Sequence, residues 1–282
     1  MQRDFTVLFR QARTLFAASA MILAASAAAA NAASCGHDSA GFESWLQDFK
    51  RHAASQGISA RTVNVALDGV TYDRRTIGLD RGQRSFKLSF EQFWAKRVSN
   101  AMIAKGRSLI KQHSGTLSRI EQRYGVPPAV LMAIWGLETA YGRDGGGNFA
   151  IIRSLATLAY DCRRSEFFQK ELFAALEVVE RGDLTPAQLR GGWAGEIGQT
   201  QFLVSSYAKY AVDFDGDGRR DLIHSVPDML ASTANFLKAK GWRRGESWHS
   251  GTGNYEVIRE WNKASVYVQT ISVMADKIAR GG

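Results

Sequence analysis

The sequence predicts a mainly α-helical protein, and three observations support this fold class. Apolar residues recur at the spacing of a helix face: in FESWLQDFKRHAASQG, Phe42, Trp45, Leu46 and Phe49 lie at i, i+3, i+4 and i+7. Helix starts are marked by capping residues such as Ser59, which precedes the next apolar segment. With 45% hydrophobic and 22% charged residues among 282, the composition is that of a globular protein with ample material for a core.

The remaining helices are predicted in order along the chain. Aromatic residues at helical spacing in RSFKLSFEQFWAKRVS, which begins at Arg84, indicate a helix whose aromatic side chains pack in the core. Gly125, with Pro127 and Pro128, separates one long amphipathic helix over residues 100–124 from the helix that carries Glu138. Later helices are expected over residues 165–181 and in the segments TQFLVSSYAKYA, VPDMLASTANFLKAKGW and WNKASVYVQTISVMADKIA. No internal repeat or Ser/Pro-rich linker follows the first 32 residues, so residues 33–282 are expected to form one unit.

The first 32 residues have the order of a secretory signal peptide. Arg3, Arg10 and Arg13 precede an uncharged apolar run, which ends in the small residues ANA. That order predicts a signal peptide over residues 1–32, cleaved on export. An uncleaved anchor helix is one alternative. A lipoprotein modified at Cys35 is another, although the preceding AAS lacks the large aliphatic residue expected there.

The chain has two cysteines, Cys35 and Cys162, and both remain after the predicted cleavage. In an oxidising compartment a single disulfide best explains such a pair. A bond between residues so distant in sequence would stabilise the fold by about 4–5 kcal/mol through chain entropy. Two free thiols are the alternative. A nucleophilic role for Cys162 is disfavoured because no His lies near it in the sequence.

The formal net charge of +9 suits an anionic partner, such as a cell-wall polymer or a membrane surface. Nucleic acid is the competing partner. The sequence has no zinc-ligand spacing, no recognition-helix signature and no stripe of alternating aromatic and basic residues. Nucleic-acid binding is therefore not expected.

Glu138 is the single formal charge between Tyr124 and Gly142. It follows Ile134 by four residues and Trp135 by three, so it shares their side of the predicted helix. If that side is buried, desolvation raises the pKa of the carboxyl group, by up to ~3–5 pH units at full burial. An acid that stays protonated near neutral pH is what cleavage of a glycosidic bond requires. The alternative is a structural Glu138 at the helix surface or paired with an arginine, either Arg143 or Arg153.

The loop after this helix favours a ligand site. Gly145, Gly146 and Gly147 carry no side chains and permit close approach of a ligand. Most glycosidases use a second carboxylate, and the candidates are Asp144 and Glu196. Neither has a strong case in the sequence. Without one, the substrate itself must supply the nucleophile.

Several motifs in order make the chain resemble the B-type family of lytic murein transglycosylases. They are GLETAYG, RSLATLAYDCRRSEFF, GWAGEIGQTQFLVSSYAKYAVDFDGDG, STANFLKAKGW and WNKASVY. The resemblance extends from about Phe42 to the C-terminus. It implies a lysozyme-like α domain with additional helical regions around a substrate cleft.

The resemblance also implies the reaction and its residues. Glu138 matches the family's sole catalytic acid and base, for non-hydrolytic cleavage of the β-1,4 bond between N-acetylmuramic acid and N-acetylglucosamine. The products carry 1,6-anhydromuramyl ends. Gln201, Phe236, Asn262 and Tyr267 match residues of the substrate cleft, although core packing is an equal alternative for Phe236 and Tyr267.

The segment DFDGDGRRD predicts a calcium loop over residues 213–228. It places three carboxylates and a glycine at EF-hand positions 1, 3, 5 and 6, namely Asp213, Asp215, Asp217 and Gly218. His224 stands where the EF-hand has its bidentate Glu, and the resemblance implies that Asp228 closes the loop instead. Alternatively, Arg219 and Arg220 neutralise the acids without a metal ion.

These expectations combine into a periplasmic, monomeric enzyme that acts on peptidoglycan glycan strands. It needs no cofactor for catalysis, and a structural calcium ion and contact with a membrane surface stay open. Two rival hypotheses are a muramidase-type hydrolase of the same bond and a non-catalytic wall-binding scaffold.

Overall fold

The computed structural model describes residues 34–82 and 88–280. The predicted signal peptide over residues 1–32 and residues 84–87 of the predicted aromatic helix lie outside this description. The helices are α1 (Phe42–Ser55), α2 (Ala60–Leu67), α3 (Arg74–Gly82), α4 (Phe90–Arg97), α5 (Asn100–Gln112), α6 (Ser114–Tyr124), α7 (Pro128–Thr139), α8 (Ile151–Tyr160), α9 (Ser165–Glu180), α10 (Val204–Tyr210), α11 (Val226–Ala239), α12 (Gly253–Trp261) and α13 (Ser265–Ala279). The strands are β1 (Phe149–Ala150), β2 (Arg190–Gly191), β3 (Glu196–Ile197) and β4 (Phe202–Leu203).

This architecture confirms the predicted mainly α fold class, and local signals account for several helix ends. The Ser59 hydroxyl accepts a hydrogen bond from the Thr62 amide at the start of α2, as a capping residue does. Helix α6 ends at Tyr124, where Gly125 takes the left-handed conformation with φ +77°. Pro128 occupies the first turn of α7, where its missing N–H costs no hydrogen bond.

The expectation of one long helix over residues 100–124 is wrong. The backbone leaves helical geometry at His113, with φ −106° and ψ 22°, and separates α5 from α6. Helix α5 packs against α7 and α13, whereas α6 packs against α11 and α7. Because α5 packs against α13 and α6 packs against α11, the chain must change direction between the two helices. The spacing of apolar residues does not reveal such a change of direction. Helix α8 was not predicted either.

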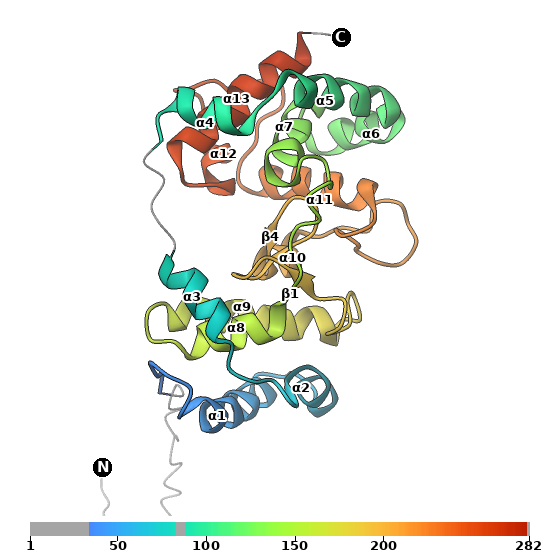
Figure 1. Cartoon of the computed structure of the whole chain (residues 1–282). Coiled ribbons are helices and arrows are strands. Elements are labelled where there is room, and N and C mark those ends of the chain that lie inside the picture. Colours follow the sequence, from blue (N-terminus) through green and yellow to red (C-terminus); the bar gives the residue numbers. More distant parts are fainter. Residues whose placement is uncertain (1–33, 83–87, 281–282) are drawn as a thin grey trace, which may run out of the picture. The chain divides into compact units, whose positions relative to one another are not determined.

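Helix α7 lies in the core and is covered on nearly all sides. Its residues from Ala129 to Leu137 are buried, and those from Val130 to Ile134 are 0% exposed. Figure 1 shows α7 next to α5 and α13, which contact it along its length. A helix that is apolar all round is stable only when other elements enclose it.

A second group of helices is built on the pair α8 and α9, with α1 and α3 against α8 and α2 against α9. The predicted disulfide is confirmed: Cys35 and Cys162 are bonded across a sequence separation of 127 residues. The adjoining backbone is paired as well, because the Gly36 amide donates to the Tyr160 carbonyl and the Cys162 amide to the Gly36 carbonyl. The alternative of two free thiols is therefore wrong.

Strands β1 to β4 form a small antiparallel sheet in the order β1-β2-β3-β4. The sequence analysis identified the segment over residues 191–198 only as Gly-rich. Gly191 shows why glycine is needed, since a Cβ there would lie 1.9 Å from the carbonyl oxygen of Glu196. Close pairing of these short strands therefore depends on the absence of a side chain.

Residues Ala33–Gly282 form one compact unit. Among the residues that the structure describes, none of the helices is both long enough and apolar enough to cross a bilayer.

Candidate active site

Glu138 lies in the last turn of α7 and is partly buried. The helix ends just beyond it in two left-handed residues, Ala140 with φ +50° and Tyr141 with φ +62°. A positive φ is costly for residues with a side chain, so surrounding contacts must hold this turn. The Tyr141 hydroxyl supplies one, donating a 3.0 Å hydrogen bond to the Met102 carbonyl of α5.

Two hydrogen bonds hold one oxygen of the Glu138 carboxyl group. Its Oε1 accepts a 2.5 Å bond from the Tyr267 hydroxyl and a 2.9 Å bond from the Trp261 indole N–H. Because both partners donate to Oε1, a proton on the carboxyl group resides on Oε2. No described residue forms a hydrogen bond with Oε2. The carboxyl group therefore has one anchored oxygen and one oxygen available to a ligand.

Burial raises the pKa of Glu138 to about 7. The hydrogen bonds from Tyr267 and Trp261 and the charge of Arg97 lower the pKa, and the charge of Glu196 raises it. Desolvation is the dominant cause. Near neutral pH, both the protonated and the ionised forms of Glu138 are thus populated, as a group that must first give and then take a proton requires.

The structure pairs Glu138 with neither of the two arginines that the sequence suggested. Arg143 instead forms an ion pair with Asp144, at 3.1 Å. Arg153 donates to the carbonyls of Thr71 and Tyr72. Within residues 34–82 and 88–280, Glu138 takes part in no ion pair.

The two candidate second carboxylates differ in their surroundings. Asp144 is exposed and held by Arg143. Glu196 in β3 is partly buried, and burial raises its pKa. Its Oε2 accepts a 3.2 Å hydrogen bond from the Ala194 amide. Glu196 is thus turned toward its own loop, although its charge acts on Glu138.

Gln201 ties the glycine-rich loop after α7 to the sheet. Its side-chain amide donates to the carbonyls of Gly146, at 3.1 Å, and Gly198, at 2.9 Å. Asn262 follows α12, and its Oδ1 accepts from the Ala264 amide at 3.0 Å. The Oε1 of Gln201 and the Nδ2 of Asn262 have no hydrogen-bond partner among the described residues.

Phe236 belongs to an aromatic cluster behind the carboxyl group. It is buried and makes edge-to-face contacts with Phe202, Tyr210 and Trp261. The ring centroids of Phe236 and Trp261 are 5.1 Å apart. The structure therefore gives Phe236 a packing position that supports Trp261, the residue that donates to Glu138.

Trp261 is a site residue that the sequence analysis did not single out. It stands directly before Asn262 in the motif WNKASVY, but this position does not reveal a bond to a residue 123 positions away. Tyr267, which was singled out, is also buried, and its ring lies edge-on to Phe93 with centroids 6.2 Å apart.

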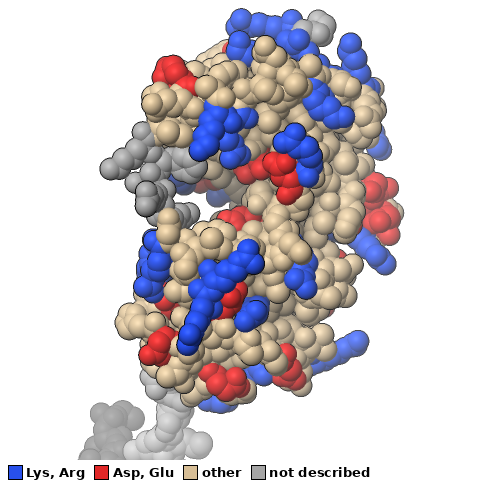
Figure 2. All heavy atoms as spheres, in the orientation of Figure 1, with Lys and Arg blue, Asp and Glu red and all other residues tan. Residues whose placement is uncertain are grey.

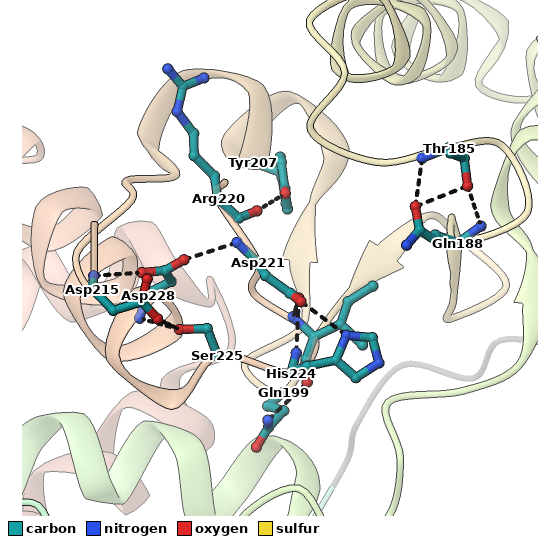
Figure 3. Close-up of polar contacts among 11 residues, drawn as sticks. Thr185, Gln188, Gln199, Tyr207, Asp215, Arg220, Asp221, His224, Ser225 and Asp228 are labelled. Carbon is teal, nitrogen blue, oxygen red and sulfur yellow. Dashed lines mark hydrogen bonds and ion pairs between the residues drawn. The ribbon is translucent and has the colours of Figure 1, made fainter. Parts of the chain in front are cut away.

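Gln199, which is drawn in Figure 3, is a second missed residue, and it connects α7 to Ile223 within the acidic loop. Its Oε1 accepts from the Trp135 indole N–H at 3.1 Å, and its main-chain carbonyl accepts from the Thr139 hydroxyl at 2.6 Å. Its side-chain amide donates to the Ile223 carbonyl at 2.9 Å. Gln199 thus holds α7 at Trp135, three residues before Glu138, and at Thr139, directly after it.

The acidic loop brings together three of its four predicted ligands. One carboxylate oxygen each from Asp213, Asp215 and Asp217 lies within 4.8 Å of the others. Asp228 is not in this group. It is 0% exposed, and its two oxygens accept hydrogen bonds from the amides of Phe214, Asp215 and Asp221. Figure 3 shows Asp228 facing this backbone, so it shapes the loop.

The arginines after the acidic group do not neutralise it. Arg220 forms an ion pair with Asp183 at 3.5 Å. No ion pair within residues 34–82 and 88–280 joins Arg219 or Arg220 to the three clustered carboxylates. A donor set made only of carboxylate oxygens fits a hard cation such as Ca²⁺.

Figure 2 shows a hollow on one face of the protein, between the region of α4 and α13 and the region of α3 and α8. Acidic side chains lie at its edge, and Lys and Arg side chains lie on both sides of it.

Comparison with known proteins connects this geometry to a family. The family model described as a transglycosylase SLT domain matches residues 41–252, which is more than half of the chain. SltB3 from Pseudomonas aeruginosa, solved in complex with NAG-NAM-pentapeptide, superposes with a TM-score of 0.79 at 32% identity, covering 86% of this chain and 80% of that one. SltB1 from the same organism superposes with a TM-score of 0.77 at 24% identity, covering 84% of this chain and 98% of that one, and supports the fold alone.

A further relative belongs to the same group of enzymes by its name. Membrane-bound lytic murein transglycosylase B of Escherichia coli (strain K12) is 43% identical over 152 residues, which are 54% of this chain. The match spans 42% of that relative's length, less than half of it. The lysozyme-like fold implied by the sequence motifs is confirmed by the solved structures. The chain therefore belongs to the transglycosylase SLT domain family, with the B-type lytic murein transglycosylases.

Proposed function

We propose that this protein is a peptidoglycan lytic transglycosylase that uses Glu138 as both acid and base. The observation that carries the proposal is the state of this carboxyl group. Its pKa is raised to about 7, Oε1 is anchored by Tyr267 and Trp261, and Oε2 faces no described partner. Family membership and the likeness to SltB3, a protein solved with NAG-NAM-pentapeptide, support the substrate class.

The proposed reaction balances with one carboxyl group. Protonated Oε2 of Glu138 donates its proton to the glycosidic oxygen, and the bond from that oxygen to C1 of N-acetylmuramic acid breaks. The acetamido group of the same sugar stabilises the positive charge at C1. The ionised Glu138 then takes the proton of the muramyl 6-hydroxyl as O6 bonds to C1. The product is a 1,6-anhydromuramyl end, and no water is consumed.

The surroundings of Glu138 suit this cycle. A pKa near neutrality limits the cost of both proton transfers, since the acid and base forms differ little in free energy at the working pH. The two hydrogen bonds to Oε1 stabilise the ionised form without displacing Oε2. We assign Tyr267 to this positioning, in addition to its expected place in the cleft.

The remaining cleft assignments rest on free polar atoms. The unpartnered Oε1 of Gln201 and Nδ2 of Asn262 can respectively accept from and donate to sugar acetamido groups. Phe236 acts through its contact with Trp261.

Product analysis tests the proposal. Purified peptidoglycan is digested with the protein, and the fragments are analysed by mass spectrometry. We expect anhydromuramyl ends; reducing ends from added water would instead identify a hydrolase. Glu138→Gln preserves the shape and the acceptor of Oε1 but cannot transfer a proton. Unchanged digestion by this variant would refute the role of Glu138 and favour another catalytic group.

The acidic loop is proposed to hold a structural calcium ion between Asp213, Asp215 and Asp217, with Asp228 ordering the backbone around them. The close grouping of the three carboxylates supports this. The ion has no step in the reaction, and catalysis is proposed to need no cofactor.

We further propose that residues 1–32 direct export to the periplasm and that residues 33–282 act as one catalytic unit. The Cys35–Cys162 disulfide supports export, because such bonds persist in oxidising compartments. It also occupies the thiol that lipid attachment would need. Mass spectrometry of the protein secreted by its host tests both points: a mature chain beginning at Ala33 is expected, and a lipid on Cys35 would contradict it.

A further inference from the structure

The last turn of α7 leaves one carbonyl without a backbone donor. In a continuing helix the Leu137 carbonyl would accept from the Tyr141 amide, but the left-handed turn at Ala140 and Tyr141 breaks this pattern. The two amides of the turn donate instead to the carbonyls of Gly136 and Trp135. Among the described residues, no backbone amide donates to the carbonyl of Leu137. Because Leu137 is buried, this carbonyl needs a partner from another element.

Arg97, the last residue of α4, provides that partner. Its guanidinium donates a 2.7 Å hydrogen bond to the Leu137 carbonyl. A cation suits this place because the C-terminus of a helix carries a partial negative charge. Leu137 directly precedes Glu138 in the chain. The bond therefore holds the backbone from which the Glu138 side chain extends.

The packing of α4 also directs Arg97 toward the hydrogen bonds of the carboxyl group. Phe93 and Arg97 are one helical turn apart on α4 and share a face of that helix. Helix α4 packs against α13, which carries Tyr267 (Figure 1). The Phe93 ring lies edge-on to Tyr267 with centroids 6.2 Å apart, and the Tyr267 hydroxyl donates to Glu138. Arg97 thus stands on the side of α4 that faces Tyr267 and Glu138.

The charge of Arg97 reaches both members of this pair. Burial raises the pKa of Glu138 and of Tyr267, and the charge of Arg97 acts on both pKa values in the opposite direction. Besides burial, the groups that act on Glu138 come from four elements, and one of them is a cation: Tyr267 of α13, Trp261 of α12, Arg97 of α4 and Glu196 of β3. Within residues 34–82 and 88–280, no carboxylate forms an ion pair with Arg97. Its positive charge is therefore not neutralised by a nearer partner.

We propose that Arg97 is a positioning residue of the transglycosylation, which holds the end of α7 through Leu137 and stabilises the negative charge that Glu138 carries between its two proton transfers. The inference rests on the proposed function, in which Glu138 is ionised once the glycosidic oxygen has taken its proton. At that stage a nearby cation offsets part of the cost that burial imposes on the carboxylate. Without this cation Glu138 is a weaker acid, so the first proton transfer slows.

Three variants separate the charge of Arg97 from its hydrogen bond. Arg97→Gln removes the charge, Arg97→Lys retains it, and Lys96→Gln is the matched control. Lys96 is an exposed cation one position earlier on α4. In the part of the chain that the structure describes, no hydrogen bond or ion pair joins Lys96 to another residue. Lys96→Gln therefore changes the net charge equally without removing a contact to α7.

The first measurement needs no substrate. The carboxyl group of Glu138 is titrated by NMR in protein that carries isotope-labelled glutamate, and Glu138→Gln assigns its resonance. The wild type should titrate at about 7. Arg97→Gln should titrate higher by about half to one pH unit, because the ionised carboxylate loses a cation whose effect solvent partly screens. Arg97→Lys should stay closer to the wild type than to Arg97→Gln, and Lys96→Gln should match the wild type.

The second measurement follows the reaction. Formation of anhydromuramyl ends from soluble glycan strands gives kcat/KM as a function of pH. In Arg97→Gln, the highest kcat/KM should fall roughly two- to tenfold because the acid is weaker. The loss of kcat/KM at high pH should move upward with the carboxyl titration, because Glu138 keeps its proton to a higher pH. Arg97→Lys should restore the pH profile of the wild type, and Lys96→Gln should leave both the rate and the profile unchanged.

The same titration of Glu138 in Arg97→Gln and in the wild type would overturn the inference, as would an equal displacement in Arg97→Lys or in Lys96→Gln. A lower kcat/KM with an unmoved pH profile would also overturn it, since that pattern belongs to a residue with a structural role alone. If the wild type forms no anhydromuramyl ends, the proposed function fails instead. The carboxyl titration still decides whether Arg97 stabilises the ionised Glu138, because it involves no turnover.

Discussion

The raised pKa of Glu138 makes a prediction about stability that is independent of any substrate. Burial moves the pKa from an ordinary 4.5 to about 7. Between these values the folded protein holds a proton that the unfolded chain releases, so the free energy of unfolding falls as the pH rises through this window. Since each pH unit of difference corresponds to about 1.36 kcal/mol, the ionised group costs the folded state about 3–4 kcal/mol above pH 7.

Glu138→Gln removes this cost. The amide stays neutral and can still accept the hydrogen bonds from Tyr267 and Trp261 through its oxygen. At pH 4 the variant and the wild type should therefore have similar free energies of unfolding. At pH 8 the variant should be more stable by about 3–4 kcal/mol, because active-site groups are commonly kept at a cost in stability. Other titrating groups contribute equally to both proteins and cancel in the difference.

Urea denaturation at pH 4, 6 and 8 measures this difference. The matched control is Glu166→Gln on α9, where the carboxylate is exposed and paired with Lys170, and where the pKa is lowered by that pair. This control should show no gain at high pH. A difference between Glu138→Gln and the wild type that stays constant from pH 4 to 8 would refute the reasoning, because Glu138 would then titrate alike in both states.

Three further predictions follow from the contacts of the site. Tyr267→Phe removes a hydrogen bond that lowers the pKa of Glu138, so the loss of kcat/KM at high pH should move upward by about one to two pH units; an unmoved pH profile would contradict this. Gln199→Leu leaves the Trp135 indole N–H and a facing carbonyl without partners and should lower the free energy of unfolding by about 2–4 kcal/mol, measured in urea, whereas a loss below about 0.5 kcal/mol would show that water replaces these contacts. Calcium should raise the Tm of the wild type but not of Asp213→Asn, and an equal rise in both would count against the proposed ion site.

Helix position was predictable where the signal is local. The Ser59 cap, the left-handed Gly125 and the first-turn Pro128 each act within a few residues, and each stands where the sequence indicates. The break at His113 was not predictable in this way. It depends on α5 and α6 having different partners, and the apolar period continues through it.

The acidic loop likewise combines a feature that the local sequence predicts with one that it does not. Asp213, Asp215 and Asp217 meet because alternate residues of one short loop must lie close together. Asp228 was expected among them, yet it satisfies three backbone amides instead. A carboxylate in a loop can accept hydrogen bonds from backbone amides instead of binding a metal ion. The spacing of acidic residues along the chain does not show which loop amides will be oriented toward which carboxylate.

The sequence by itself determined that Glu138 is a lone carboxylate in an apolar helix, because hydrophobicity along one helix is a local property. Only the tertiary structure decided that Oε1 is anchored and Oε2 is free. The donors that make the difference, Trp261 and Tyr267, are 123 and 129 residues away in the chain. They reach Glu138 because α13 packs beside α7 and α12 packs against α13, and the orientation of a side chain in a packed core depends on neighbours that no periodicity can specify.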